Sequence, residues 1–457
     1  MNKNNFVLII IDAVSFAISW FIFFYLRRIY IDKSEFIISY KLIIGTFTIT
    51  VFWITLFYLF NKYHNIFKSS KIKYFLEHLK VSFIGCLILF FFILLDDKIS
   101  NYKNYYISFS MLFMSQFITS YLFRFIYLYI INKKQYFNTI IIGNNTQANK
   151  INQELTKSKT YKNLKILGFV EIEKTKGKIT SPLKNIGIIR EIKKIIKKHE
   201  IEEIIIAINT KNKKIIEFII HEVYEFNINI KITSDTQDII SGLVKMNNLD
   251  TISLIEIKQE LLTPGEKLLK TSFDKIFSLI MIIILSPIFV IFSCLVFFSS
   301  KGPIIYSQKR LGKKGIEFSI YKFRSMYENA EINGPQLSSK NDTRITKIGK
   351  IMRKTRIDEL PQFINVLKGD MSIIGPRPER NYYFQRIMQK EPNYKYLLKV
   401  KPGITSIGIV KYGYAENINQ MIERMKYDLI YIENISLIND LKILILTIFV
   451  MIQGRGK

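Results

Sequence analysis

The chain has very little histidine and cysteine. Among its 457 residues there are four histidines and two cysteines, and no histidine follows Glu260. Both cysteines, Cys86 and Cys294, lie in apolar runs, so we expect no disulfide. The C-terminal half therefore lacks the residues for His-assisted serine catalysis, a thiolate nucleophile or a Cys/His zinc site. It retains carboxylates, arginines, lysines and glycine-rich turns, which are the groups of phosphoryl chemistry with an oxygen-loving cation such as magnesium.

Acidic residues are also in short supply. The chain has 37 Asp and Glu residues against 66 Lys and Arg, which gives a formal net charge of +29. A basic surface for anionic lipid headgroups or phosphorylated substrates is one interpretation. The other is that lysine is abundant along the whole chain, so that only local clusters are informative. The length and the 49% of hydrophobic residues predict two or three domains, with membrane segments beside soluble parts.

Long apolar runs predict a membrane domain over residues 1–135. The four expected helices cover residues 5–26, 40–60, 81–95 and 105–131, and the third is short for a bilayer crossing. Lysines follow the second and fourth helices, whereas Asp96 and Asp97 follow the third. The positive-inside rule therefore places both ends of this bundle in the cytoplasm. Asp12 and Arg124 lie within apolar segments, where a functional role and a structural pair are both open.

Residues 136–260 alternate between strand-like and helix-like patterns. The strand-like runs cover residues 139–145, 165–171, 202–209 and 227–234, and the helical patterns cover residues 189–199 and 213–226. This alternation predicts a Rossmann-like parallel α/β domain. Its first turn has Gly143 followed by Asn144, Asn145 and Thr146, so the glycines of GxGxxG that let a pyrophosphate approach the backbone are missing. The domain is therefore degenerate, and a regulatory or assembly role is favoured over nucleotide binding.

A different type of membrane segment is predicted within residues 261–457, which we expect to form an α+β domain. Ile276–Phe298 is almost wholly apolar, has lysines on both flanks, and is broken at Ser286 and Pro287. Proline removes a helix hydrogen bond, and a nearby serine can satisfy the freed carbonyl. A crossing helix would put everything from Lys301 onward outside the cell. We therefore predict a re-entrant helix over residues 270–300, with a kinked crossing helix as the alternative.

Two adjacent carboxylates, Asp358 and Glu359, lie in the stretch RKTRIDELPQFINVLKGDMSIIGPRP. Pro361 is tolerated in the first turn of a helix and Gly369 ends one, so the pattern predicts a helix between them. The residues expected on its buried face are Leu360, Phe363, Ile364 and Leu367. The helix N-terminus should keep Asp358 ionised and favour phosphate binding. One carboxylate could attack while the other holds a metal; a solvated capping turn is the alternative.

Seven motifs follow one another in the C-terminal half of the chain. They are QKRLG (308–312), YKFRSM (321–326), DTRITKIGK (342–350), DELPQ (358–362), NVLKGDMS (365–372), GPRP (375–378) and KPGIT (401–405). In this order they resemble the bacterial sugar transferase family, the monotopic phosphoglycosyl transferases, from Leu261 to the C-terminus. The whole architecture resembles the large form of that family, the polyprenyl-phosphate sugar-phosphate transferases with an N-terminal membrane domain.

The resemblance implies roles for individual residues. Asp358 would attack the sugar-bearing phosphorus and form an aspartyl phosphosugar intermediate, which the lipid phosphate then displaces. Glu359 would ligate magnesium, and Arg353 and Arg377 would bind phosphate oxygens in the bidentate manner that arginine favours. The other substrate-binding candidates lie in the same motifs or in the matching stretch DLIYIENISLINDLKI: Gln308, Arg310, Lys322, Arg324, Pro402, Gly403 and Asp428.

The activity implied by the resemblance is transfer of a sugar phosphate from a UDP-sugar to undecaprenyl phosphate, which releases UMP and starts capsule, O-antigen or exopolysaccharide synthesis. The resemblance also implies the bacterial inner membrane, with the catalytic domain facing the cytoplasm and touching membrane lipid. We expect no nucleic-acid partner and leave a homodimer open. The rival functions are a catalytically inactive scaffold or regulator of polysaccharide export and a nucleotide-sugar oxidoreductase in the middle domain.

Overall fold

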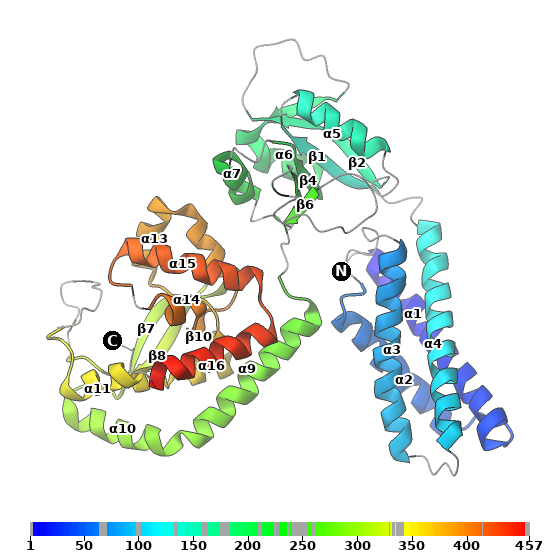
Figure 1. Ribbon diagram of the computed structural model, residues 1–457, viewed down its shortest axis with the longest axis horizontal. Coiled ribbons are helices and arrows are strands. Elements are labelled where there is room, and N and C mark those ends of the chain that lie inside the picture. Colours follow the sequence, from blue (N-terminus) through cyan, green and yellow to red (C-terminus); the bar gives the residue numbers. More distant parts are fainter. Residues whose placement is uncertain are drawn as a thin grey trace. The chain divides into compact units, whose positions relative to one another are not determined.

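The structure is a computed structural model, and it divides into two compact units, Met1–Pro264 and Gly265–Lys457 (Figure 1). The residues that it describes are 3–63, 71–96, 102–131, 136–143, 145–157, 163–172, 183–208, 213–223, 226, 228–234, 238, 254–257, 261–328, 330, 334, 342–413 and 415–452. The predicted turn residue Asn144 lies outside them. The first unit contains a helical bundle and an α/β region, which are described separately below.

Four long helices form the N-terminal bundle. They are α1 (Lys3–Arg27), α2 (Tyr40–Leu59), α3 (Lys71–Asp96) and α4 (Tyr102–Ile131), and a π-helical turn, Arg28–Asp32, extends α1. All four are long and apolar enough to cross a membrane, which confirms the prediction of four membrane helices. The third is not short, because it begins at Lys71 rather than at Val81. Its first turns contain polar residues, of which Glu77 pairs with Lys62 at 2.6 Å and His78 shares a 2.9 Å hydrogen bond with Ser120.

The two charged residues inside the apolar segments form an ion pair between helices. Arg124 on α4 donates from Nε to Asp12 Oδ1 at 2.7 Å and from Nη2 to Asp12 Oδ2 at 2.5 Å, and neither side chain is exposed. The guanidinium also lies 4.6 Å from the centroid of the Phe57 ring and donates to the Tyr74 hydroxyl at 3.3 Å. Charged groups within a membrane bundle are stable when paired in this way. The pair joins α1 to α4.

The α/β region has one six-stranded sheet with the order β3-β2-β1-β4-β5-β6. Its strands are β1 (Phe137–Ile142), β2 (Leu164–Glu171), β3 (Asn185–Ile188), β4 (Glu203–Ile206), β5 (Asn229–Thr233) and β6 (Leu254–Ile257). All neighbours are parallel except β5 and β6, which confirms the predicted parallel α/β region. Helix α5 (Asn145–Lys157) packs on one face, and α6 (Ile192–His199) and α7 (Lys213–Val223) pack on the other.

Three of these elements were not anticipated. Strands β3 and β6 have only four residues each and lie at the two edges of the sheet, so their sequences carry little periodic signal. Helix α5 is polar apart from Ala148, Ile151 and Leu155, which are spaced to form one buried stripe. The glycine of the first turn has a packing role, since a Cβ on Gly143 would lie 2.5 Å from the carbonyl oxygen of Ala207.

The second unit is built around a bent pair of helices and two small sheets. Helix α9 (Pro264–Ile284) and helix α10 (Ser286–Ser299) meet at an angle of 63°. The bend lies at the predicted Ser286 and Pro287, where the Ser286 hydroxyl donates to the Ile283 carbonyl at 2.7 Å. One sheet is the antiparallel hairpin of β7 (Ile305–Leu311) and β8 (Glu317–Phe323); the other pairs β9 (Ser372–Ile374) in parallel with β10 (Gly403–Thr405).

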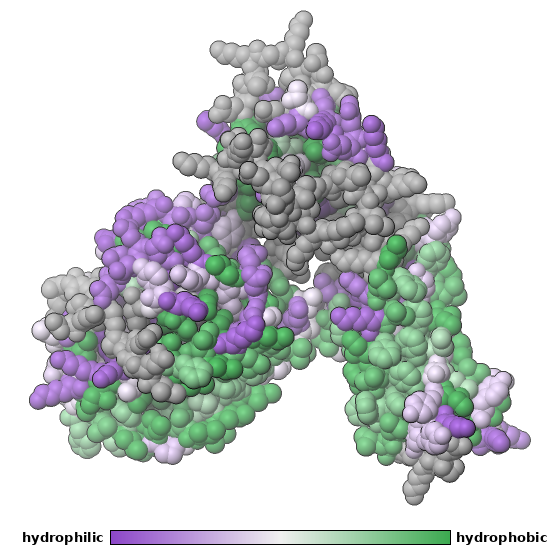
Figure 2. Space-filling model, in the orientation of Figure 1, coloured by the Kyte–Doolittle hydropathy of each residue, from purple (hydrophilic) through white to green (hydrophobic). Residues whose placement is uncertain are grey.

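In the described part of this unit, six further α-helices and a 3-10 helix, Pro392–Lys399, surround these elements. The α-helices are α11 (Lys347–Thr355), α12 (Gln362–Lys368), α13 (Asn381–Lys390), α14 (Ile407–Lys411), α15 (Ile418–Glu433) and α16 (Leu437–Ile452). Helices α9 and α10 form a bent band along one side of the unit (Figure 1), and Figure 2 shows that side as hydrophobic. Its exposed apolar side chains include Ile276, Ile283, Val290, Leu295 and Phe298. An apolar surface of this extent is characteristic of contact with a membrane or a partner.

The Asp12–Arg124 pair should be a main determinant of bundle stability. We expect Asp12→Asn to destabilise the full-length protein by roughly 3–5 kcal/mol, because Arg124 would stay buried without its counterion. Thermal unfolding in detergent measures the change. The matched control is Glu423→Gln, which removes an exposed pair with Lys426 (2.8 Å) and should change stability by about 0.5 kcal/mol or less. Equal effects of the two substitutions would contradict this assignment.

Candidate active site

The two adjacent carboxylates lie in a tight turn between two helices. Asp358 and Glu359 belong to a 3-10 turn, Ile357–Glu359, that follows α11 and precedes α12. Arg356 has φ 57°, in the left-handed region, and this reverses the chain direction after α11. Both carboxylates are buried, with 8% and 6% of their surfaces exposed, so a solvated capping turn is excluded. Burial makes their charges depend on nearby cations rather than on water.

The helix that follows the turn differs in register from the prediction. It runs between Pro361 and Gly369 as expected, and both carboxylates lie in the turn just before its N-terminus, but its buried face is different. Ile364 is exposed, and the buried positions are Gln362, Phe363, Asn365 and Val366. The buried face differs because Asn365 makes hydrogen bonds there: its side chain accepts from the Tyr321 backbone N–H at 3.0 Å and donates to the Ser319 carbonyl at 2.7 Å. Asn365 therefore binds α12 to the free edge of β8.

Glu359 is held by two cations from separate parts of the chain. Lys322 on β8 places Nζ 2.7 Å from Glu359 Oε1, and Arg377, just after β9, places Nη2 3.3 Å from the same oxygen. Arg353 on α11 donates to the Ser325 hydroxyl at 2.9 Å, and its charge acts on Asp358. The structure thus gathers five of the predicted residues at one place: Lys322, Arg353, Asp358, Glu359 and Arg377.

The two carboxylates differ in acidity. Burial and the negative charge of Glu359 raise the pKa of Asp358 to about 6. Burial alone would also raise the pKa of Glu359, but Lys322 and Arg377 hold that pKa below its usual range. Asp358 is therefore mostly ionised at neutral pH, as expected. Its pKa is nevertheless raised, because the effect of burial and of Glu359 exceeds that of the surrounding cations Lys322, Arg353 and Arg377.

The remaining predicted residues lie in two other places. Gln308, Arg310, Pro402, Gly403 and Asp428 surround the chain from Gly375 to Glu379, whereas Arg324 lies at the end of α10. Arg310 donates to the Pro378 carbonyl at 3.2 Å and to Gln308 Oε1 at 2.7 Å, and the Gly403 N–H donates to the Pro376 carbonyl at 2.9 Å. Asp428 accepts from the Gly408 N–H at 2.9 Å. Arg310 and Gly403 thus support the loop that carries Arg377, and Gln308 binds Arg310, whereas Asp428 holds the start of α14.

Arg324 has a structural position that the motif did not reveal. Its guanidinium donates to the carbonyls of Val296 at 3.1 Å, Pro303 at 2.5 Å and Ser300, and to the Ser300 hydroxyl at 3.2 Å. Cations near the carboxyl end of a helix satisfy the last carbonyls, which have no partner within the helix. Arg324 therefore joins β8 to the end of α10.

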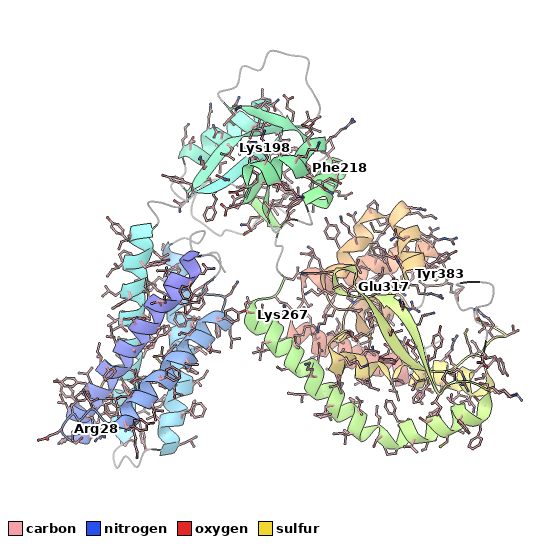
Figure 3. The ribbon with its side chains drawn as sticks, turned by 180° about the vertical axis from the view of Figure 1, so that it is seen from behind. Arg28, Lys198, Phe218, Lys267, Glu317 and Tyr383 are labelled. Atoms are coloured by element: carbon pink, nitrogen blue, oxygen red, sulfur yellow. The ribbon has the colours of Figure 1, made fainter. Side chains whose placement is uncertain are left out.

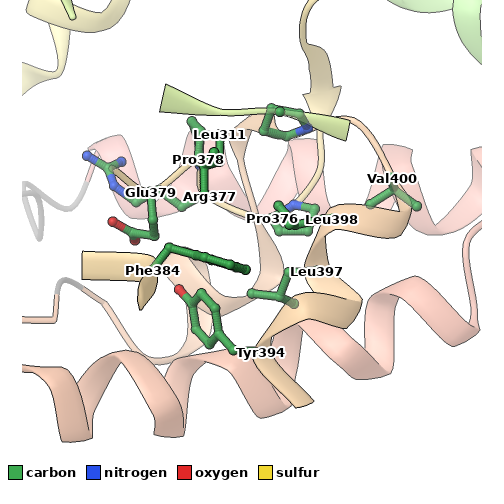
Figure 4. A pocket seen from close by; sticks show the side chains of 12 residues that line it. Leu311, Pro376, Arg377, Pro378, Glu379, Phe384, Tyr394, Leu397, Leu398 and Val400 are labelled. Atoms are coloured by element: carbon green, nitrogen blue, oxygen red, sulfur yellow. The ribbon is translucent and has the colours of Figure 1, made fainter. Parts of the chain in front are cut away.

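Sequence reasoning missed a buried ion pair beside this loop. Arg424 donates to Glu379 Oε1 at 2.6 Å, and both side chains are almost fully buried. The signal was weak: Glu379 directly follows GPRP, and Arg424 lies four residues before Asp428 on one face of α15. A small hollow lies next to Glu379 (Figure 4) and is lined by Arg377, Phe384, Tyr394 and Leu397, among others.

The donor set fits a magnesium ion only together with a substrate. Among the residues that the structure describes, no group of three or more His, Cys, Asp or Glu side chains could hold a metal ion. Asp358 and Glu359 offer carboxylate oxygens, and Glu359 also engages Lys322 and Arg377. Magnesium in phosphoryl-transfer sites is commonly bound by one or two carboxylates and completed by phosphate oxygens and water. This pair suits that arrangement and does not form an all-protein cage.

Comparison with known proteins places the chain in a family. The bacterial sugar transferase family matches residues 265–454, and a family described as a CoA-binding domain matches residues 74–234. A Bacillus subtilis protein, assigned provisionally as an undecaprenyl-phosphate N-acetylgalactosaminyl 1-phosphate transferase, is 47% identical over 126 residues, which cover 28% of this chain and 70% of that protein. The chain belongs to the bacterial sugar transferase family.

Longer relatives match over more of this chain. The Aeromonas hydrophila UDP-N-acetylgalactosamine-undecaprenyl-phosphate N-acetylgalactosaminephosphotransferase is 39% identical over 227 residues, which cover 50% of this chain and 52% of that protein. The UDP-glucose:undecaprenyl-phosphate glucose-1-phosphate transferase of Escherichia coli strain K12 is 32% identical over 268 residues, which cover 58% of this chain and 57% of that protein. The chain thus matches about half of the length of these two relatives.

The position of Arg324 leads to a stability prediction. Arg324→Ala should destabilise the protein by roughly 3 kcal/mol, because several hydrogen bonds to a charged donor are lost and the end of α10 is left uncapped. Thermal unfolding of the full chain measures this. Arg386→Ala, at an exposed arginine over the Tyr382 ring, is the control and should cost about 0.5 kcal/mol or less. A loss of substrate affinity at unchanged stability would instead restore Arg324 as a binding residue.

Proposed function

We propose that this protein transfers a sugar phosphate from a UDP-sugar to undecaprenyl phosphate, with undecaprenyl-diphospho-sugar and UMP as products, and so starts synthesis of a surface polysaccharide. The observation that carries this proposal is the buried Asp358–Glu359 pair with Lys322, Arg353 and Arg377 around it. The names of the relatives, which act on UDP-sugars and undecaprenyl phosphate, support it. An inactive scaffold is disfavoured, because it would have no need for buried, charge-matched carboxylates.

The chemistry follows from the unequal carboxylates. Asp358, ionised at neutral pH, is the nucleophile: its oxygen bonds to the phosphorus that bears the sugar, and the bond from that phosphorus to UMP breaks. A phosphate oxygen of the lipid then attacks the same phosphorus and expels Asp358. No general base is needed, because both attacking oxygens are already anionic. Magnesium held by Glu359 would neutralise charge on the diphosphate, and Arg353 and Arg377 are positioned to bind phosphate oxygens.

We infer that α9 and α10 form a re-entrant hairpin in the bacterial inner membrane and that the catalytic unit faces the cytoplasm. The 63° bend between two apolar helices supports this geometry. Lys267, near the start of α9 (Figure 3), and Lys301, just after α10, are both exposed and basic. The positive-inside rule assigns both to the cytoplasmic side. In this arrangement the lipid acceptor reaches the Asp358–Glu359 dyad at the membrane surface.

We also infer that the α/β region is a Rossmann-like domain with a supporting role. The strand order β3-β2-β1-β4-β5-β6 is that of a doubly wound sheet. However, the close approach at Gly143 is made to the backbone of Ala207, on the neighbouring chain segment. That contact accounts for the glycine without a pyrophosphate. This favours a regulatory or assembly role over a nucleotide-sugar oxidoreductase.

Cysteine labelling tests the membrane hairpin. Lys267→Cys and Lys301→Cys, each in a background without Cys86 and Cys294, should both be protected from a membrane-impermeant thiol reagent in intact cells. The reason is that both ends of a re-entrant helix pair stay on the cytoplasmic side. Both sites should react after the cells are opened, which serves as the control for accessibility. Labelling of only position 301 in intact cells would show a crossing helix.

Product analysis tests the reaction and the nucleophile. Given a panel of UDP-sugars without lipid, the wild-type protein should release one UMP per enzyme, and the peptide with Asp358 should gain the mass of a phosphosugar. Asp358→Asn should lose nearly all turnover, on the order of 10³-fold or more, because its neutral amide lacks the anionic oxygen that attacks the phosphorus. Glu359→Gln should retain more activity and show a weaker magnesium dependence.

Turnover in the same assay should depend on pH. Because the pKa of Asp358 is about 6, turnover should fall as the pH drops through 6 and the nucleophile takes up a proton. Release of UDP in place of UMP would indicate a plain glycosyl transferase. UMP release that requires lipid phosphate, with no labelled peptide, would indicate a single displacement in which Asp358 acts as a base or metal ligand.

A further inference from the structure

One face of the membrane helix α9 holds the strand that leads to Arg377. Asp274, on that face, accepts from the Ser372 hydroxyl at Oδ2 over 2.7 Å and from the Ile373 backbone N–H at Oδ1 over 3.2 Å. Asp274 is 5% exposed and Ser372 is 1% exposed. Both carboxylate oxygens are therefore used to hold β9, and water is excluded from the contact.

A second charged residue, one turn earlier on α9, holds the end of the same strand. Lys270 Nζ lies 2.5 Å from Asp440 Oδ2 on α16 and donates to the Ile374 carbonyl at 3.3 Å. The Tyr431 hydroxyl on α15 donates to Asp440 Oδ1 at 2.6 Å and also lies 3.3 Å from the Ile374 carbonyl. Helices α9, α15 and α16 thus meet at the last residue of β9.

The segment that connects β9 to Arg377 is short and tightly packed, and Arg377 in turn contacts Glu359 of the Asp358–Glu359 dyad. Gly375 follows Ile374, and its N–H donates to the Thr405 carbonyl at 3.1 Å. A Cβ on Gly375 would lie within 3.0 Å of the backbone of residues 401–403, so this glycine is closely fitted against β10. Two residues further on, Arg377 reaches Glu359 at 3.3 Å. A shift of β9 along α9 would therefore move Arg377 relative to Glu359.

Apolar packing alone would bury this face of α9 without setting its position along the strand. Hydrogen-bonded charges are different, because their directional contacts favour one register and their burial is costly in any other. The opposite face of α9 has exposed apolar residues, including Ile276, Leu279, Ile280 and Ile283. Lys270 and Asp274 are thus charged residues of α9 whose side chains turn toward β9 and bind it, away from this apolar face.

We propose that Asp274 and Lys270 are positioning residues, which fix β9 against the membrane helix and so hold Arg377 in place beside the catalytic dyad. The effect of this positioning on turnover rests on the proposed function, whereas the positioning itself does not. Neither residue touches the dyad in the structure, and both act through the strand. The seating of α9 in the membrane and the geometry of the active site are then one coupled arrangement.

The experiment measures Arg377 directly in the full-length protein. Phenylglyoxal modifies accessible arginines, and mass spectrometry of the digested protein gives the modification rate at each one. Asp274→Asn should raise the rate at Arg377 by about fivefold, the change expected for the net loss of one hydrogen bond. Ser372→Ala, which removes a single partner and keeps the residue size, should raise it in the same direction and covers the case in which Asp274→Asn fails to fold.

Thr447→Val is the matched control. It removes a partly buried 2.9 Å hydrogen bond between α16 and Thr405 on β10, in the same unit, and leaves the hydrogen bonds between α9 and β9 in place. It should leave the rate at Arg377 unchanged, and Arg386, which is exposed, should react equally in all variants. An unchanged rate at Arg377 in Asp274→Asn, or an equal rise in Thr447→Val, would overturn the proposal.

A double-mutant cycle of turnover rates then tests the consequence of this positioning for activity. Arg377→Lys and Asp274→Asn should each lower UMP release, and the double variant should lose little more than Arg377→Lys alone, because Asp274 acts through Arg377. Additive losses would assign Asp274 an independent role and contradict the positioning. Should the wild-type protein release no UMP from any UDP-sugar, the proposed function fails, while the Arg377 modification rates still decide whether α9 holds that residue in place.

Discussion

The ion pairs that converge on Glu359 are the interaction on which the catalytic unit depends. Lys322 comes from a hairpin, Arg377 from the loop after β9, and Glu359 from a turn between two helices. One carboxylate oxygen therefore holds three distant segments together. The neighbouring carboxylate, Asp358, is less well compensated by cations, and burial raises its pKa to about 6. A single arrangement thus stabilises the site and makes Asp358 chemically distinct from Glu359.

Buried ion pairs recur in several parts of the protein, where they join separate elements. Asp12 and Arg124 join two membrane helices, Lys270 and Asp440 join α9 to α16, and Glu379 and Arg424 join the Arg377 loop to α15. Such pairs add little net stability compared with apolar packing, but breaking one is costly. They act mainly to fix which elements meet and in which register. In a chain so rich in lysine and isoleucine, this specificity has particular value.

Much of the site could be anticipated from sequence. The order of the seven motifs identified the family, and five of the predicted residues do lie together. The four membrane helices and the parallel sheet followed from hydrophobic runs and alternation. The sequence did not reveal the register of α12, because the amide of Asn365 pairs with β8, an element more than forty residues away. The sequence also could not show that Arg324 caps α10, because an arginine in a predicted phosphate-binding motif has the same sequence signature whether it binds substrate or backbone carbonyls.

The sequence by itself determined the classes of element and the chemical inventory: which segments are apolar enough for a membrane, where helices break, and that the C-terminal half has no histidine but many carboxylates and cations. These depend on local periodicity and residue type. Only the tertiary structure decided how the charges are shared. Whether Asp358 or Glu359 is the more acidic, and whether Asp274 faces lipid or a strand, depends on partners brought together from distant parts of the chain, and burial gives those partners their effect.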